Sequence, residues 1–167
     1  AFIGILLVLT NLEENKKLNL QQAFLLTTLS WLSIAIFGSL PFLQSSIQLS
    51  LVDSFFESMS GITTTGSTII TDLDNAPKSI LIWRAILQWL GGIGIIVMAI
   101  TILPLLNVGG MQLFRMESSS TTEKILPKTR EVTFLISLIY FVLTFFCAVA
   151  YWFFGMNKFD SVAHAMT

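Results

Sequence analysis

Hydrophobic positions along this chain form long blocks separated by short polar connections. Residues 20–43, 79–106 and 132–156 are almost entirely apolar, and each segment exceeds the roughly 20 residues that a helix needs to cross a bilayer. The apolar residues 1–10 are too few to span, so they predict the end of a preceding transmembrane helix. The pattern therefore predicts an all-α membrane protein.

A shorter amphipathic stretch lies between the first two spanning segments. Ser54 and Glu57 have the spacing of a capping box, which predicts a helix over 54–63. A helix of this length rises only about 15 Å, half of a bilayer. It therefore predicts a re-entrant pore helix, after which the chain returns to the polar cluster at 72–78.

The residues that follow this half-helix are hydroxyl-rich and contain a glycine: Thr63, Thr64, Thr65, Gly66 and Ser67. Irregular backbone at membrane depth survives only where protein buries it or where it lines a watery path. Backbone carbonyls can replace the hydration shell of a cation, and a glycine permits conformations closed to other residues. We interpret 63–67 as a selectivity filter that binds K⁺ at the carbonyls of residues 64–66; the alternative is a simple turn between helices.

Lysine and arginine predict the orientation. The loops at 11–19 and 107–130 carry most of the basic residues, so the positive-inside rule places them in the cytoplasm. The half-helix then enters from outside. We expect 107–130 to be a cytoplasmic linker with an interfacial helix around 111–116.

The chain contains the beginning of an internal repeat. Asp160, Ser161 and Met166 match Asp53, Ser54 and Met59 at one constant offset, and each set follows a spanning segment. We predict a first pore repeat over 11–106 and the start of a second over 131–167, with its pore helix beginning at residue 160. Both copies run in the same sense, which favours a central pore over an inverted-repeat carrier.

Composition narrows the function class. Hydrophobic residues make up 54% of the chain and charged residues 11%, which is typical of an integral membrane protein. The net charge of −1 and the absence of a basic patch give no support for nucleic-acid binding. A single cysteine, Cys147, excludes an intrachain disulfide, and no nucleophile–base pair or metal-ligand cluster indicates an enzyme or a cofactor.

Several further residues are candidates for supporting the pore. Gly91, Gly92 and Gly94 lie within an apolar helix, where close packing against the pore loop is more plausible than phosphate binding. Arg84 either pairs with a partner at the outer mouth or extends to the interface. Glu57 is either a helix cap or part of the vestibule, and His164 occupies its place in the second copy.

Four stretches resemble the Trk/Ktr/HKT superfamily of potassium transporters, and most closely the transmembrane subunits of bacterial Trk systems. They are DSFFESMSGITTTGST (53–68), QWLGGIGIIVMAITILP (88–104), VGGMQLFR (108–115) and the restart at 159–167. The resemblance implies a pseudo-fourfold pore in one polypeptide, in which Gly66 is the filter glycine of the first repeat. It also implies potassium as the transported ion, a bacterial inner membrane, a homodimer and a cytoplasmic ring of nucleotide-binding regulatory subunits. The alternatives are a secondary carrier with a re-entrant binding hairpin and a non-conducting membrane subunit.

Overall fold

The computed structural model describes residues 19–73, 75–106 and 125–167, and all regular secondary structure within them is helical. The helices, in chain order, are α2 (Leu20–Gly38), α3 (Leu40–Leu43), α4 (Leu51–Ile62), α5 (Lys78–Leu106), α7 (Ile125–Phe153) and α8 (Lys158–Met166). This agrees with the all-α membrane fold expected from the sequence.

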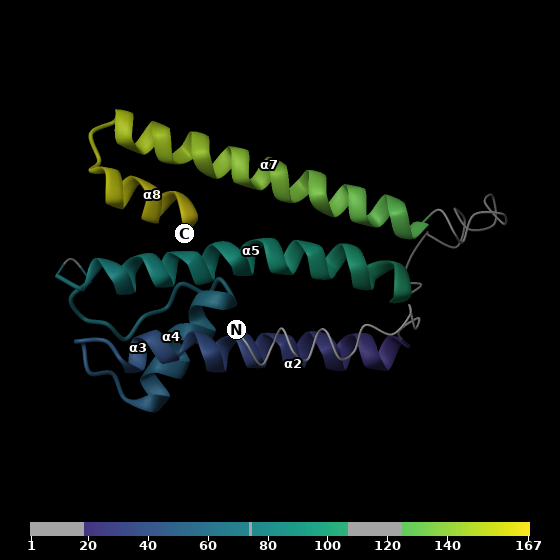
Figure 1. The fold of residues 1–167 in the computed structure, drawn as a ribbon, viewed down its shortest axis with the longest axis horizontal. Helices are drawn as coiled ribbons and strands as arrows, with labels where there is room; N and C mark the ends of the chain where they lie inside the picture. The colour runs from purple at the N-terminus through teal and green to yellow at the C-terminus, as the bar shows by residue number, and fades with distance from the viewer. Residues whose placement is uncertain (1–18, 74, 107–124) are drawn as a thin grey trace, which may run out of the picture.

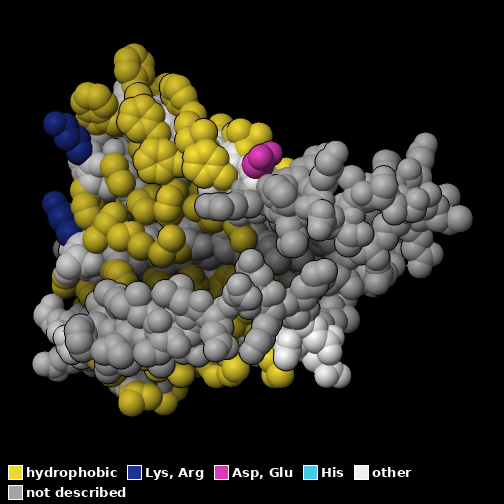
Figure 2. Space-filling view, turned by 45° about the vertical axis from the view of Figure 1, so that its right-hand side comes forward, with side chains coloured by type: hydrophobic (Ala, Val, Ile, Leu, Met, Phe, Trp, Pro, Cys, Tyr) yellow, Lys and Arg dark blue, Asp and Glu magenta, His cyan; other side chains and the backbone are white. Residues whose placement is uncertain are grey.

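Within the described residues, three helices are long and apolar enough to cross a membrane: Gln21–Leu43, Lys78–Ile100 and Glu131–Phe153. They lie side by side, with α5 between α2 and α7 (Figure 1). Most side chains of α7 face outward, and hydrophobic side chains cover much of the described surface (Figure 2). Such a surface is suited to lipid, so the chain is an integral membrane protein.

The first spanning segment is interrupted near its end. We predicted one helix over 20–43, whereas α2 ends at Gly38 and the single turn of α3 follows Ser39. Pro41 has no N–H with which to continue the helical hydrogen bonds, which accounts for a break one turn earlier. The Ser39 hydroxyl donates to the carbonyl of Ile36 at 2.7 Å, at the turn between α2 and α3.

Helices α4 and α8 have equivalent N-terminal caps. The hydroxyl of Ser50 accepts a hydrogen bond from the Asp53 N–H at 3.1 Å, and the side chain of Asn157 accepts one from the Asp160 N–H at 2.9 Å. These caps are related by the same offset as the sequence match, and both helices start at the same end of the bundle and run inward (Figure 1). The predicted capping box of Ser54 and Glu57 is wrong, because α4 already begins at Leu51.

Other helix bounds differ from the expected ones by smaller amounts. The third spanning helix begins at Ile125, inside the predicted linker, and ends at Phe153; α8 begins at Lys158. The expectations for residues 1–10, for the interfacial helix around 111–116 and for most of the linker fall outside the described residues.

The pore helix α4 packs mainly against α5 and α2. A small hydrophobic core of Phe42, Ile70, Ile80 and Leu87 joins α3, the irregular segment between α4 and α5, and α5. Twelve residues of helix rise about 18 Å, well short of the roughly 30 Å of bilayer hydrocarbon. Packing against α5 and α2 places the C-terminal end of α4 beside Gly91 of α5.

Candidate ion-filter site

The end of α4 forms a turn that fixes the start of the predicted filter. The Thr65 N–H donates to the carbonyl of Ser60 and the Thr64 N–H donates to the carbonyl of Gly61, both at 3.0 Å. This pair of bonds is the Schellman pattern, which places the residue after the cap in the left-handed region. Thr64 occupies that position with φ +56°, although glycine is the usual residue there.

The left-handed conformation is costly for a β-branched residue, by about 1–2 kcal/mol. Strain of this kind persists only when surrounding contacts enforce it, and it concentrates at functional sites. Gly66 also has positive φ, at +77°, so two of the five residues of the predicted filter have left-handed backbone conformation. The loop is therefore held in a specific, strained shape.

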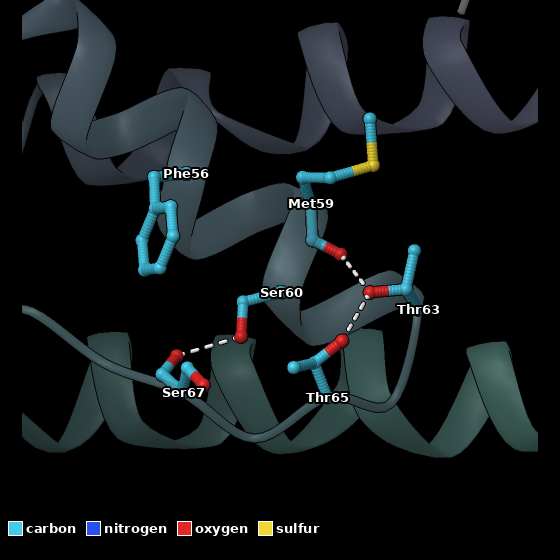
Figure 3. A pocket seen from close by; sticks show the side chains of 6 residues that line it. All are labelled: Phe56, Met59, Ser60, Thr63, Thr65 and Ser67. Carbon is cyan, nitrogen blue, oxygen red and sulfur yellow. Dashed lines mark hydrogen bonds between the residues drawn. The ribbon is translucent and has the colours of Figure 1, made fainter.

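The threonine hydroxyls bond to protein groups. The Thr63 hydroxyl donates to the Met59 carbonyl at 2.8 Å, and the Thr63 and Thr65 hydroxyl oxygens lie 2.8 Å apart (Figure 3). Since the Thr63 proton is committed to Met59, Thr65 is the donor of the second bond. The Ser60 hydroxyl donates to the Ser67 carbonyl at 2.6 Å and ties the far end of the loop to α4.

An open hollow of about 180 Å³ lies between α4 and the loop. Phe56 and Met59 form its apolar side, and Ser60, Thr63, Thr65 and Ser67 its hydroxyl-bearing side (Figure 3). The surface of the hollow itself is almost entirely apolar, because the hydroxyls of Ser60, Thr63 and Thr65 are engaged in hydrogen bonds within the protein. The Thr63 hydroxyl anchors the start of the loop to α4 through the Met59 carbonyl.

Glu57 is the most deeply buried charged group among the described residues, with a side chain that is 0% exposed. Its Oε1 accepts hydrogen bonds from the Thr68 hydroxyl and from the Ile69 N–H, each at 2.6 Å. Its Oε2 lies 3.1 Å from Nε of Arg84. Glu57 is therefore neither a helix cap nor exposed in this structure. It joins α4 to Thr68 and Ile69, which follow the loop, and to Arg84 on α5.

Arg84 completes this junction from α5. Its side chain is 13% exposed, and its second contact is a 2.7 Å hydrogen bond from a terminal nitrogen to the Gly66 carbonyl. The sequence left two roles open for Arg84, pairing with a partner or extending to the membrane interface, and the geometry agrees with pairing. The Gly66 carbonyl already accepts a charged donor, whereas within the described residues no hydrogen bond reaches the carbonyls of Thr64 and Thr65.

The glycines of α5 have different neighbours. A Cβ on Gly91 would lie 2.0 Å from the Ile62 carbonyl oxygen, so α5 makes direct backbone contact with the end of the pore helix at this residue. A Cβ on Gly92 would meet the Tyr140 hydroxyl at 2.7 Å, and one on Gly94 would lie 3.5 Å from Trp31. Only Gly91 of the three touches the filter region; Gly92 faces α7 and Gly94 faces α2.

Some supporting residues could not be anticipated from the sequence. Ser60, Thr68 and Ile69 bind or position the loop, but nothing in the local pattern distinguishes them from other residues of a hydroxyl-rich turn. Trp83 donates from Nε1 to the Gly38 carbonyl at 2.9 Å and links α5 to the end of α2. These contacts join segments that are distant in sequence.

The remaining candidates lie away from this loop. His164 is on α8, exposed, with Nδ1 2.9 Å from the Asp160 carbonyl oxygen. Cys147 is half-buried on α7. No group of three or more His, Cys, Asp or Glu side chains within the described parts of the chain is arranged to hold a metal ion. Any cation ligands at this loop would therefore be backbone and hydroxyl oxygens.

The chain matches known cation transporters over nearly all of its length. The TrkH family model, described as a cation transport protein, matches residues 2–166. The chain is 51% identical over 146 residues to the Trk system potassium uptake protein TrkI of Halomonas elongata, covering 87% of this chain and 30% of TrkI. It is 45% identical over 166 residues to TrkH of Escherichia coli K12, covering 98% of this chain and 34% of that protein.

A solved structure shows the same fold. The crystal structure of the potassium transporter TrkH from Vibrio parahaemolyticus superimposes with a TM-score of 0.82 at 40% identity, covering 99% of this chain and 32% of that one. The chain thus spans about a third of the length of these relatives. Given the family match, the identities and the shared fold, the chain belongs to the TrkH family of cation transport proteins.

Proposed function

We propose that the complete protein takes up potassium through a single-chain pore, and that residues 63–67 form the filter strand of its first repeat. The observation that carries this proposal is the loop at the end of α4. It lies beside Gly91 of the spanning helix α5 and is strained at Thr64, and within the described residues no protein donor engages the carbonyls of Thr64 and Thr65. The relatives are named potassium uptake proteins, which supports potassium as the ion.

The electrostatics at this position suit a cation. The C-terminal end of α4 points toward the loop, and the partial negative charge of a helix C-terminus favours positive charge. Carbonyl dipoles can coordinate a dehydrated ion without the desolvation cost of fixed anions. Gly66 contributes the left-handed backbone that turns the strand toward the outer face.

One strand cannot surround an ion, so the proposal includes further repeats. The matching caps of α4 and α8 support a first repeat over 11–106 and a second beginning within 131–167. Phe56, on α4 beside the hollow, is 43% exposed, and the proposal expects further repeats to cover such apolar surface. From the resemblance to the Trk/Ktr/HKT superfamily we also propose that the complete protein is a homodimer in the bacterial inner membrane and binds a cytoplasmic ring of nucleotide-binding subunits.

The test is Gly66→Ala in the complete protein. The substitution meets no atom within 4 Å, so its cost is conformational, about 1–2 kcal/mol, and membrane insertion should survive. We expect uptake of K⁺ relative to Na⁺ to fall in proteoliposomes. Gly155→Ala is the matched control, because Gly155 also has positive φ and open space but lies in the connection between α7 and α8.

The outcome distinguishes the candidate functions. Unchanged ion discrimination in Gly66→Ala would refute the filter assignment. Saturable movement of another solute, independent of this residue, would favour a carrier. A reconstituted protein that passes neither K⁺ nor Rb⁺ would indicate a non-conducting subunit.

A further inference from the structure

The Glu57–Arg84 pair is built differently from a simple buried ion pair. Each Glu57 oxygen is used: Oε1 by the Thr68 hydroxyl and the Ile69 N–H, Oε2 by Arg84. Arg84 then extends to the Gly66 carbonyl. The pair therefore fixes the strand on both sides of Ser67. A buried carboxylate is tolerated only with such compensation, so the network is interdependent.

The arginine changes what the Gly66 carbonyl can do. This oxygen lies 2.7 Å from a guanidinium nitrogen, and a cation bound to the same oxygen would be repelled by the guanidinium charge. The carbonyls of Thr64 and Thr65 carry no such donor within the described residues. The three carbonyls are therefore not equivalent as ion ligands.

The second short helix lacks the same anion. The offset that relates the two N-caps places His164 at the position of Glu57. An imidazole cannot offer two acceptor oxygens, and His164 contacts the carbonyl of Asp160 on its own helix. The Glu57 network is thus a property of the first short helix and is not copied in the second.

We propose that Glu57 and Arg84 are positioning residues that set the cation affinity of the filter at the first repeat. Arg84 holds the Gly66 carbonyl, so this repeat offers the ion the carbonyls of Thr64 and Thr65, and Glu57 balances the arginine charge beside them. This inference rests on the filter function proposed above. The first and second repeats would then differ in the carbonyls that they offer to the ion, because His164 replaces Glu57 in the second.

If Glu57 and Arg84 act through their charges, removing one or the other should shift KM in opposite directions; a purely structural ion pair predicts no such opposite shifts. Glu57→Gln keeps the size of the side chain and an acceptor for Thr68 and Ile69, but leaves the arginine charge uncompensated; KM for K⁺ uptake should rise about tenfold. Arg84→Gln leaves the carboxylate uncompensated, and KM should fall about tenfold. The double variant removes both charges and should return KM to within about twofold of the wild-type value.

The experiment measures K⁺ and Rb⁺ uptake by the complete protein in proteoliposomes, normalised to inserted protein. Glu131→Gln, an exposed carboxylate on α7, is the control for loss of one charge and should leave KM unchanged. If Arg84→Gln does not fold, the neutral double variant and Glu57→Gln still test the charge balance. Shifts of KM in opposite directions support the proposal.

Three results would overturn it, and they are distinguishable. If the Glu57 and Arg84 variants keep the wild-type KM while Gly66→Ala loses selectivity, the filter stands and the charge-balance role is wrong. If Gly66→Ala also keeps its selectivity, the filter assignment itself fails. Equal loss of transport in both single variants with an unchanged KM would indicate a structural role only.

Discussion

Replacing Gly91 by alanine tests the direct contact between α5 and the end of the pore helix. The added Cβ would lie 2.0 Å from the Ile62 carbonyl oxygen and 2.8 Å from its carbonyl carbon. Real Cβ contacts rarely fall below 3.0 Å, so the end of α4 must withdraw from α5 by about 1 Å. The obstacle is backbone and cannot rotate away as a side chain would.

The magnitude follows from this geometry. Overpacking a close contact typically costs about 1–3 kcal/mol, and a backbone obstacle places Gly91→Ala at the upper end of that range. Ile62 immediately precedes the loop, so the displacement passes to Thr64, whose methyl would itself lie 3.2 Å from the new Cβ. Errors of about 1 Å are large for an ion site, and we expect discrimination of K⁺ against Na⁺ to fall roughly tenfold or more.

The assay compares thermal unfolding and ion uptake of the purified complete protein with those of a control. Gly94→Ala lies three residues further along α5, where a Cβ would make an ordinary 3.5 Å contact with Trp31. Alanine also favours a helix over glycine by about 1 kcal/mol, so this control should be neutral or stabilising. If Gly91→Ala has the same melting temperature and the same ion selectivity as Gly94→Ala, the close contact between α5 and the end of α4 is refuted.

Two further predictions concern the loop and its support. Thr64→Gly should relieve the strain at φ +56° and raise the unfolding free energy by about 1 kcal/mol, while weakening K⁺ selectivity; a destabilised variant in thermal melts would contradict the strain argument. Trp83→Phe removes the hydrogen bond to the Gly38 carbonyl and should lower stability by about 0.5–1.5 kcal/mol with ion selectivity retained; melting at the wild-type temperature would show that this bond contributes nothing.

The local pattern of apolar and polar residues was sufficient to predict the spanning helices and the position of the loop between them. Each spanning segment is apolar over a length that only a bilayer requires, and a half-length helix followed by threonines and a glycine has few other uses in a membrane. Two of the four stretches that carry the family resemblance, 53–68 and 88–104, lie in these same regions. The predicted all-α architecture and membership of this transporter family are confirmed.

Contacts between distant segments could not be predicted in the same way. Ser54 and Glu57 match the spacing of a capping box, but Ser50 caps the helix and Glu57 is used 11 and 27 residues away, at Thr68 and Arg84. A pattern of neighbouring residues cannot distinguish these uses of one carboxylate. The Schellman turn was also hidden, because Thr64 stands where glycine is the usual signal.

Ion density in the complete protein tests the central claim most directly. A structure determined with Rb⁺ or Tl⁺ in place of K⁺, located by anomalous scattering, should place an ion in contact with the Thr64 and Thr65 carbonyl oxygens and away from the Gly66 carbonyl held by Arg84. An ion bound elsewhere in the pore, with these two carbonyls turned away from it, would contradict the assignment of residues 63–67 as a filter strand.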